Sequence, residues 1–360
     1  MKLRLYEFDL PLRHVFTISR GSVAVQKTLI VDLEHDGLHG YGEATANPYY
    51  GATVENMAAA LLGVQSEIER WSPSDPVAFW DALHPALGEQ PFAHCALDQA
   101  AHDLWGKAAG APVYRLWGLP LQRLPVSNYT IGIDTVDRMI AKLDECPGWP
   151  VYKIKLGTPH DLEIVRQLRH HTDAVFRVDA NCGWTADETL RNARELRDLN
   201  VEFIEQPLPA DAVEEMRRVA AECVLPVIAD ESCGVPADVV RCHGCFHGIN
   251  IKLVKCGGLT PARRMIAQAR RLGLKVMVGC MTESTVGISA IAQLLPQLDY
   301  VDMDGAVLLA RDIATGVAVE RGTCRYPNEN GCGVQLVAEP LRVWAWCGNG
   351  PGATGPLSRS

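Results

Sequence analysis

The chain has no long hydrophobic run, no excess of positive charge and no low-complexity segment in its central part. No stretch approaches 18 uncharged apolar residues, and the first nine residues hold no apolar segment of the kind that directs export. The net charge of −9 and the pI near 5.7 argue against nucleic acid or an anionic membrane surface as the main partner. These absences favour a cytoplasmic globular protein, and 360 residues suffice for one large barrel or two domains.

Cysteine is not scarce, but its distribution excludes a small disulfide-bonded secreted domain. Twelve cysteines are scattered through apolar runs of a long chain, so we expect reduced thiols. Cys242 and Cys245, followed by His247, resemble half of a zinc site, but no second well-spaced pair accompanies them. We therefore predict no zinc at this position.

The first 120 residues predict an α+β unit. Residues 29–33 and 40–43 have the pattern of paired strands joined by a glycine-containing turn. Apolar residues at helical spacing follow over 54–70 and 94–109. Strands followed by helices are typical of an α+β layer.

Residues 121–321 repeat a different pattern, in which short apolar runs alternate with helical segments such as 187–199 and 260–272. Runs that are apolar on both faces are typical of buried parallel strands, so eight of them predict an α/β fold of the (β/α)8 TIM-barrel type. Residues 322–347 are expected to return to the N-terminal unit, and 348–360, rich in glycine and proline, to form a flexible tail. The strand-like runs are 129–133, 151–157, 175–181, 201–207, 226–232, 248–254, 275–281 and 300–304.

Three acidic residues, Asp179, Glu205 and Asp230, stand near the ends of consecutive strand-like runs. Because the carboxyl ends of neighbouring barrel strands open on one cavity, these side chains should converge. Their oxygens are hard ligands with no histidine or cysteine among them, which favours Mg²⁺, or Mn²⁺ as a second choice, over zinc. Without an ion, three carboxylates in one pocket would repel one another and take up protons. The sequence therefore predicts a divalent metal site, while the alternative of three separate surface ion pairs would have to hold at three successive strand ends.

Two lysines flank this site along the chain. Lys155 on the second run and Lys252 on the sixth should lie on opposite sides of the metal, with pKa values lowered by the cation and by each other. Lys153 faces the same way as Lys155 and adds to the positive field. A hydrogen next to a carboxylate is a weak acid, but a metal that stabilises the enediolate would let two lysines exchange that proton across both faces. The alternative for Lys252 is a solvated helix start, since Lys255 follows it.

The motifs around these residues resemble those of the enolase superfamily, in its muconate-lactonizing subgroup. They are Lys-x-Lys, Asp-x-Asn, Glu-Gln-Pro, Ala-Asp-Glu-Ser and Asn-Ile-Lys, and they occur in this order. The resemblance covers nearly the whole chain and implies an α+β capping domain over 1–120, completed by the segment after 320, on a modified barrel. It also implies that Lys155 and Lys252 are the acid/base pair and that the three carboxylates are Mg²⁺ ligands.

Further residues distinguish between the reactions of this subgroup. Asp302 and Asp304, two apart on the eighth run, should face one cavity and form a pair of acceptors for an ammonium group. Cycloisomerases and o-succinylbenzoate synthases act on substrates without a free amine, whereas this pair resembles the Asp-x-Asp motif of the dipeptide epimerases. By the same resemblance, Glu283 is expected to contact Lys252. The alternative for Asp304 is a cap of the turn before Gly305.

The capping domain is expected to supply the pocket for the substrate side chain. Residues 16–22 resemble the specificity loop of the dipeptide epimerases, and Arg20 stands where Ala-Glu epimerases have an arginine that meets the glutamate carboxylate. Residues 48–51 resemble the second cap loop, whose two tyrosines could close over a substrate. Thr130, on the first barrel strand, is expected to bond the peptide backbone.

Together these features predict a Mg²⁺-dependent dipeptide epimerase that moves a proton at the α-carbon of the C-terminal residue, acting on L-Ala-D/L-Glu. Alternatives within the subgroup are an epimerase of apolar or basic dipeptides, a cycloisomerase and an N-acylamino acid racemase. A Schiff-base lyase would not need the three carboxylates, and a non-catalytic binding protein would not need both lysines. We expect a small dipeptide as the ligand and a homo-oligomer as the assembly, without nucleic-acid or membrane partners.

Overall fold

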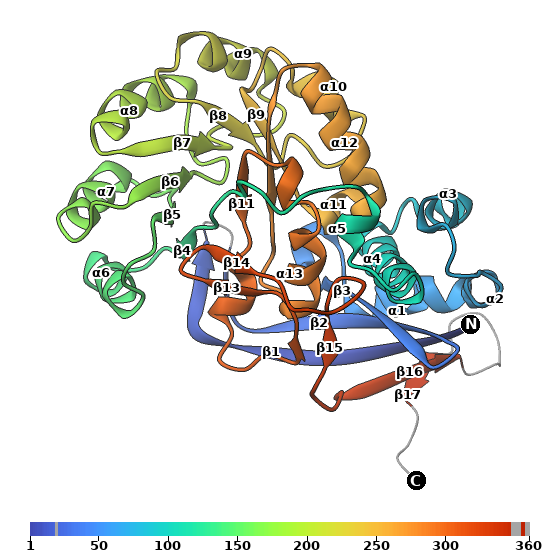
Figure 1. Ribbon diagram of the computed structural model, residues 1–360. Helices are drawn as coiled ribbons and strands as arrows, with labels where there is room; N and C mark the ends of the chain where they lie inside the picture. Colours follow the sequence, from blue (N-terminus) through green and yellow to red (C-terminus); the bar gives the residue numbers. More distant parts are fainter. Residues whose placement is uncertain (19–20, 347–353, 357–360) are drawn as a thin grey trace.

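The computed structural model describes residues 1–18, 21–346 and 354–356 and consists of a capping sheet with helices and a barrel beside it (Figure 1). The sheet is five-stranded, in the order β17-β16-β1-β2-β3. Leu5 of the first strand lies opposite Trp344, so the two ends of the chain share one sheet. Its strands are β1 (Lys2–Ile18), β2 (Gly21–His35), β3 (Leu38–Thr45), β16 (Arg342–Trp346) and β17 (Thr354–Pro356).

The long helix α4 packs directly on strand β3, and glycine makes this close approach possible. A Cβ added at Gly42 would lie 2.0 Å from the Ala96 carbonyl oxygen, and one at Gly40 would lie 2.3 Å from the Ala100 oxygen. The two glycines are two residues apart and therefore share the face of β3 that meets the helix. The elements of the cap outside its sheet are η1 (Pro48–Tyr50), α1 (Val54–Gly63), α2 (Gln65–Glu69), α3 (Pro76–Leu87), α4 (Pro91–Ala108) and α5 (Val113–Leu116).

The barrel is an eight-stranded parallel sheet in which the strands follow one another in chain order from β4 to β11 (Figure 1). All five residues of β5, the strand over 151–155, are buried, which agrees with apolar residues on both faces. Each of the eight predicted runs therefore contains a strand, and the charged residues lie at the strand ends, either as the last residue of the strand or directly after it. They are β4 (Tyr129–Ile131), β5 (Val151–Lys155), β6 (Val175–Asp179), β7 (Val201–Glu205), β8 (Val227–Ala229), β9 (Gly248–Ile251), β10 (Lys275–Gly279) and β11 (Tyr300–Asp302).

Helices connect the barrel strands up to β11, after which a short 3-10 helix, η3, takes the place of an eighth α-helix. This departure from eightfold regularity, together with the cap, makes the fold a modified TIM barrel. The helices are α6 (Val136–Glu145), α7 (Asp161–Arg169), α8 (Ala186–Asp198), α9 (Val213–Glu222), α10 (Asp238–Cys242), α11 (Leu253–Cys256), α12 (Leu259–Arg271), α13 (Thr285–Ala292), η2 (Leu295–Gln297) and η3 (Gly305–Leu308).

The barrel closes between β4 and β11 through few backbone contacts and several side chains. Ser127, just before β4, forms an isolated parallel bridge with Val301. The Ser127 hydroxyl also accepts a hydrogen bond from the Met303 N–H at 2.9 Å. Polar side chains at the ends of these strands complete the seam, so the closure lies next to the open end of the barrel.

The C-terminal segment contacts both parts of the protein. Gly322 accepts a hydrogen bond from the Ser127 N–H at 2.8 Å, and the segment then reaches the capping sheet as β16. Three residues of the predicted flexible tail form β17 instead, and the rest of that tail lies outside the described residues. Along the chain, the short strands between β11 and β16 are β12 (Ala314–Thr315), β13 (Ala318–Glu320), β14 (Thr323–Arg325) and β15 (Gln335–Leu336).

Some local expectations differ from the structure. The predicted helix over 54–70 is divided at Val64, which ends α1 and precedes α2, and α3 was not predicted. The predicted loop over 16–22 consists, in its described residues, of paired strand ends, with Phe16 opposite Val23. The domain boundaries at residues 120 and 321 remain sequence-based predictions. Within the described ranges, no helix has both the length and the apolar character needed to cross a membrane.

Replacing Gly42 by alanine should destabilise the cap, because the added methyl group would overlap the backbone of α4. Overpacking of this kind costs about 1–3 kcal/mol, so the urea midpoint should fall. Gly63→Ala is the matched control, since a Cβ there meets nothing within 4 Å at the exposed end of α1. The control should be neutral or stabilising by up to about 1 kcal/mol. Equal midpoints for the two variants would show that β3 and α4 can separate without cost.

Candidate active site

Three buried carboxylates meet at the C-terminal end of the barrel. Asp179 and Glu205 are the last residues of β6 and β7, and Asp230 directly follows Ala229 at the end of β8. Each offers an oxygen, and these atoms lie within 4.8 Å of one another. The structure thus brings together the three acidic residues that the sequence places at successive strand ends.

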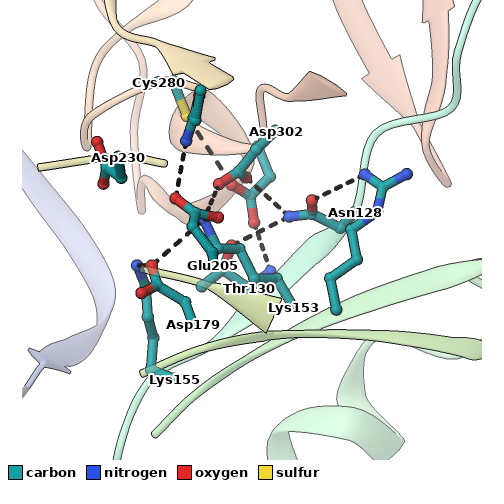
Figure 2. A network of polar contacts seen from close by, with 12 residues as sticks. Asn128, Thr130, Lys153, Lys155, Asp179, Glu205, Asp230, Cys280 and Asp302 are labelled. Atoms are coloured by element: carbon teal, nitrogen blue, oxygen red, sulfur yellow. Dashed lines mark hydrogen bonds and ion pairs between the residues drawn. The ribbon is translucent and has the colours of Figure 1, made fainter. Parts of the chain in front are cut away.

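Two lysines of β5 neutralise part of this negative charge (Figure 2). The Lys155 Nζ lies 2.6 Å from Asp179 Oδ2. The Lys153 side chain is 1% exposed, and its Nζ lies 2.7 Å from Glu205 Oε2 and 2.8 Å from Asp302 Oδ2. Because these lysines are two residues apart on one strand, their side chains lie on the same face of β5 and point into the interior of the barrel.

Asp230 is held by two further lysines. Lys252 lies 2.8 Å from Asp230 Oδ2, and Lys255 lies 2.6 Å from Asp230 Oδ1. Lys255 was considered only as a sign of a solvated helix start, yet its residue is 5% exposed and it also donates to the Asp230 carbonyl oxygen. Its spacing of three from Lys252, one helical turn along α11, was the signal that could have identified it. Asn250 was also missed, although it donates to Glu205 Oε1 at 2.8 Å.

The pKa values of these groups follow from burial and from the lysines. Burial raises the pKa of Glu205 to about 7, since the attraction of Lys153 offsets only part of it. Burial also disfavours ionised Asp230, but the attraction of Lys252 and Lys255 outweighs it and holds the pKa well below the ordinary value. Burial lowers the pKa of Lys252, but the negative charges around it, first Asp230 and then Glu205, together outweigh burial, so the pKa lies above the ordinary value. The lowered pKa predicted for Lys252 presupposes a bound divalent cation that neutralises Asp230, and it stays a prediction.

The carboxylate triad has the composition of a hard-metal site. All three groups are oxygen donors with no sulfur or imidazole between them, and they are close enough to bind one ion. The buried Asn181 amide oxygen, two residues after Asp179, has no hydrogen-bond partner among the described residues. The residues therefore fit a divalent cation that prefers oxygen ligands.

A second acidic pair lies at the barrel seam. Asp302 accepts from the Asn128 amide at 2.7 Å and from Lys153, while Asp304 accepts from the Thr130 N–H at 2.5 Å. Burial and the charge of Asp302 raise the pKa of Asp304 to about 8, whereas the pKa of Asp302 is lowered because Lys153 outweighs its burial. The two carboxylates are therefore not equivalent: Asp302 pairs with Lys153, whereas no lysine or arginine among the described residues forms an ion pair with Asp304. Asn128 lies between predicted motifs and gave no sequence signal.

A cavity of about 480 Å³ lies beside the two lysines and the second acidic pair. Its inner wall contains Lys155, Lys252, Asp302, Asp304 and Thr130, which the sequence had assigned to one site. Its outer wall comes from the cap and from η3, and most of its side chains are apolar or aromatic. They are Phe16, Ile18, Val23, Val25, Tyr49, Tyr50 and Leu308.

Three predicted residues require separate comment. Arg20 lies outside the described residues. Glu283 is buried and accepts from the Met281 N–H at 2.8 Å, and its relation to Lys252 is an electrostatic attraction rather than the expected contact, because Lys252 pairs with Asp230. Thr130 is engaged at its backbone by Asp304, and its hydroxyl accepts from Asn128 at 3.3 Å.

Comparisons with known proteins agree with this architecture. The family described as "Mandelate racemase / muconate lactonizing enzyme, N-terminal domain" matches residues 2–118, and "Enolase C-terminal domain-like" matches residues 136–339. An "L-Ala-D/L-amino acid epimerase" of Flavobacterium johnsoniae is 56% identical over 94% of this chain and 100% of its own length. An "L-Ala-D/L-Glu epimerase" of Bacteroides thetaiotaomicron is 39% identical over 94% of this chain and 88% of its own length.

A solved structure is similar over the same extent. The dipeptide epimerase of Methylococcus capsulatus, described as complexed with Mg and the dipeptide L-Arg-D-Lys, has a TM-score of 0.82 and 34% identity. The match covers 93% of this chain and 99% of that one. With its cap, its modified barrel and its strand-end carboxylates, the chain belongs to the mandelate racemase/muconate lactonizing enzyme family of the enolase superfamily.

Proposed function

We propose that this protein is a dipeptide epimerase that inverts the α-carbon of the C-terminal residue of an L-alanyl dipeptide. One observation carries the proposal: Lys155 and Lys252, on strands far apart around the barrel, line the same cavity as Asp302 and Asp304. A proton can thus be exchanged at one end of a small zwitterion while an acidic group receives its ammonium at the other. The epimerase names of similar proteins from Flavobacterium johnsoniae and Bacteroides thetaiotaomicron support this reading.

The two lysines can act on opposite faces of one carbon atom. Lys155 enters the site from β5 beside Asp179, and Lys252 enters from the end of β9 beside Asp230. With the carboxylates between them, one lysine takes the α-proton and the other returns a proton to the opposite face. The net reaction moves one proton at one carbon and is an isomerisation.

We propose Mg²⁺ as the ion held by Asp179, Glu205 and Asp230, with Mn²⁺ as a possible substitute. When bound, the ion supplies positive charge against the negative charge that develops on the substrate carboxylate as the α-proton leaves. Lys153 contributes further positive charge from beneath the site, where it contacts Glu205 and Asp302. The Mg²⁺ complex of the Methylococcus capsulatus epimerase supports the choice of ion.

Asp304 is the acceptor that we assign to the substrate ammonium. Its carboxyl group faces the cavity, and its pKa of about 8 reflects burial beside the charge of Asp302. An ammonium placed there would remove the electrostatic cost of ionising Asp304. The substrates of a cycloisomerase or an N-acylamino acid racemase have no free α-amino group to place at this position. Both functions are therefore weaker alternatives.

The second residue of the dipeptide should meet the outer wall of the cavity. Its described side chains are largely apolar and favour apolar residues such as leucine. Arg20 remains our candidate for a glutamate carboxylate, and Lys27, which lines the cavity and pairs with Glu7 at 3.2 Å, is a second cation nearby. We propose a broad preference for L-Ala-D/L-Xaa that includes glutamate. Homo-oligomer formation and a cytoplasmic location remain predictions.

Replacement of either base should separate the two faces of the reaction. In D₂O, Lys155→Ala should lose epimerisation of L-Ala-Glu but retain α-proton exchange from one epimer, and Lys252→Ala should retain exchange from the other. Deuterium incorporation into each epimer is followed by mass spectrometry. Lys275→Met is the control, since this exposed lysine pairs only with Asp299 in the described structure and should leave the rate unchanged. Near wild-type interconversion by either alanine variant would rule out the two-base assignment.

Removal of divalent ions should abolish activity, because the carboxylates of the triad would lack the cation that the substrate carboxylate needs. Protein treated with EDTA should be inactive and should regain its rate on addition of Mg²⁺. Asp230→Asn should need higher Mg²⁺ for half-maximal rate. Full activity after EDTA treatment, with no response to Mg²⁺, would contradict the metal assignment.

Arg20→Met should reduce the preference for glutamate. Two charge-assisted hydrogen bonds to a carboxylate are worth roughly 1.5–3 kcal/mol, so kcat/KM for L-Ala-L-Glu should fall by roughly tenfold to a hundredfold. L-Ala-L-Leu should lose little, and Lys27→Met serves as the matched loss of a cation. If Lys27→Met lowers kcat/KM only for L-Ala-L-Glu, then Lys27 is the residue that binds the acidic side chain. Equal losses for both dipeptides in Arg20→Met would leave Arg20 without a role in specificity.

A further inference from the structure

Gln206 occupies an unusual backbone conformation next to the carboxylate triad. It directly follows Glu205, is 0% exposed and has φ of 35°, in the left-handed region that side chains other than glycine rarely adopt. Such a conformation persists when the surrounding contacts determine it strongly.

The side chain of Gln206 ties the end of β7 to the chain after β8. Its Oε1 accepts from the Asp230 N–H at 2.9 Å and from the Ser232 N–H at 3.1 Å. Its Nε2 donates to the Leu208 carbonyl oxygen at 2.9 Å and to the Ser232 hydroxyl at 2.8 Å. The side-chain amide thus donates two hydrogen bonds and accepts two. One of its partners is the backbone N–H of Asp230, a member of the triad.

The backbone of Gln206 extends these ties to the strands on both sides. Its N–H donates to the Ile228 carbonyl oxygen at 2.9 Å, within β8, and its carbonyl oxygen accepts from the Cys182 N–H at 2.8 Å, beyond the end of β6. The strands β6, β7 and β8 are neighbours in the sheet (Figure 1). One residue therefore bonds to all three chain segments that carry the triad.

We propose that Gln206 is a positioning residue that fixes the relative placement of Asp179, Glu205 and Asp230 and thereby sets the affinity of the site for a divalent ion. The inference rests on the proposed function only in taking the triad as the metal site. The lysines that contact the triad bind the carboxylate groups themselves, whereas Gln206 holds the backbone from which those groups extend. Loss of its amide would free the backbone at Asp230 and weaken binding by releasing a preorganised site.

The direct test is the binding of Mg²⁺ to metal-stripped protein by isothermal titration calorimetry. Gln206→Met keeps the length of the side chain and removes its four hydrogen bonds, so its Kd should be about 10- to 100-fold weaker. Gln206→Asn keeps an amide and tolerates the left-handed backbone, but it is one methylene shorter and should also bind more weakly. It supplies the answer if the methionine variant does not fold.

Gln293→Met is the matched control. Gln293 is 1% exposed, accepts from the Tyr114 N–H at 3.1 Å and donates to the Ser289 carbonyl oxygen at 3.0 Å, away from the cavity. It should lose thermal stability like the Gln206 variants but keep its Mg²⁺ affinity within about twofold. A second readout is the Mg²⁺ concentration for half-maximal rate, which should rise in Gln206→Asn while the rate at saturating Mg²⁺ largely recovers.

The outcomes separate this inference from the proposed function. If wild-type protein binds Mg²⁺ and a folded Gln206 variant binds it equally well, the positioning role is wrong and the epimerase proposal stands. If Gln293→Met weakens binding as much, the effect is general destabilisation, and the positioning role is again wrong. If wild-type protein binds no divalent ion, both the metal site and the role of Gln206 fail.

Discussion

The buried charges at the open end of the barrel form the interaction on which the rest of the site depends. Four carboxylates, Asp179, Glu205, Asp230 and Asp302, meet Lys153, Lys155, Lys252 and Lys255 at distances of 2.6–2.8 Å. Removing one member of such a buried set leaves an uncompensated charge, which typically costs about 3–5 kcal/mol. The set therefore constrains the barrel strands relative to one another. It also places buried charges where, in the proposed function, a metal cation and a zwitterionic dipeptide would bind.

The seam of the barrel and the proposed substrate site share their residues. Asp302 and Asp304 bond across the closure to Asn128 and Thr130, where the backbone ladder between β4 and β11 is short. Lys153 connects this seam to the metal-type triad, because it contacts both Glu205 and Asp302. Closure of the barrel thus positions Asp304, the proposed ammonium acceptor, relative to the two candidate bases.

The sequence predicts those features that depend on local pattern. The strand ends were predictable because apolar runs and the charged residues after them are read within a few positions, as at Asp179 and Glu205. The open end of the barrel then brings them together through a general property of parallel strands. The order of the motifs also identified the family before any contact was known.

The remaining features depend on contacts between distant positions. Lys153 binds Asp302, 149 residues away, so its buried position could not be read from the strand pattern. The raised pKa of Lys252 results from its pairing with Asp230. The sequence-based prediction considered only the repulsion from a metal ion and from the other lysine. The role of Gln206 requires knowing that Asp230 and Ser232 lie beside it, and the strand ends at Phe16 resembled a loop because their partners are across a hairpin.

A crystal structure with Mg²⁺ and L-Ala-L-Glu tests the account most directly. We predict the ion at Asp179, Glu205 and Asp230, the dipeptide ammonium at Asp304, and the Nζ atoms of Lys155 and Lys252 on opposite sides of the α-carbon of the glutamate. An ion bound instead between Cys280, Asp302 and Asp304, or a dipeptide with both lysines on one side of that carbon, would contradict it.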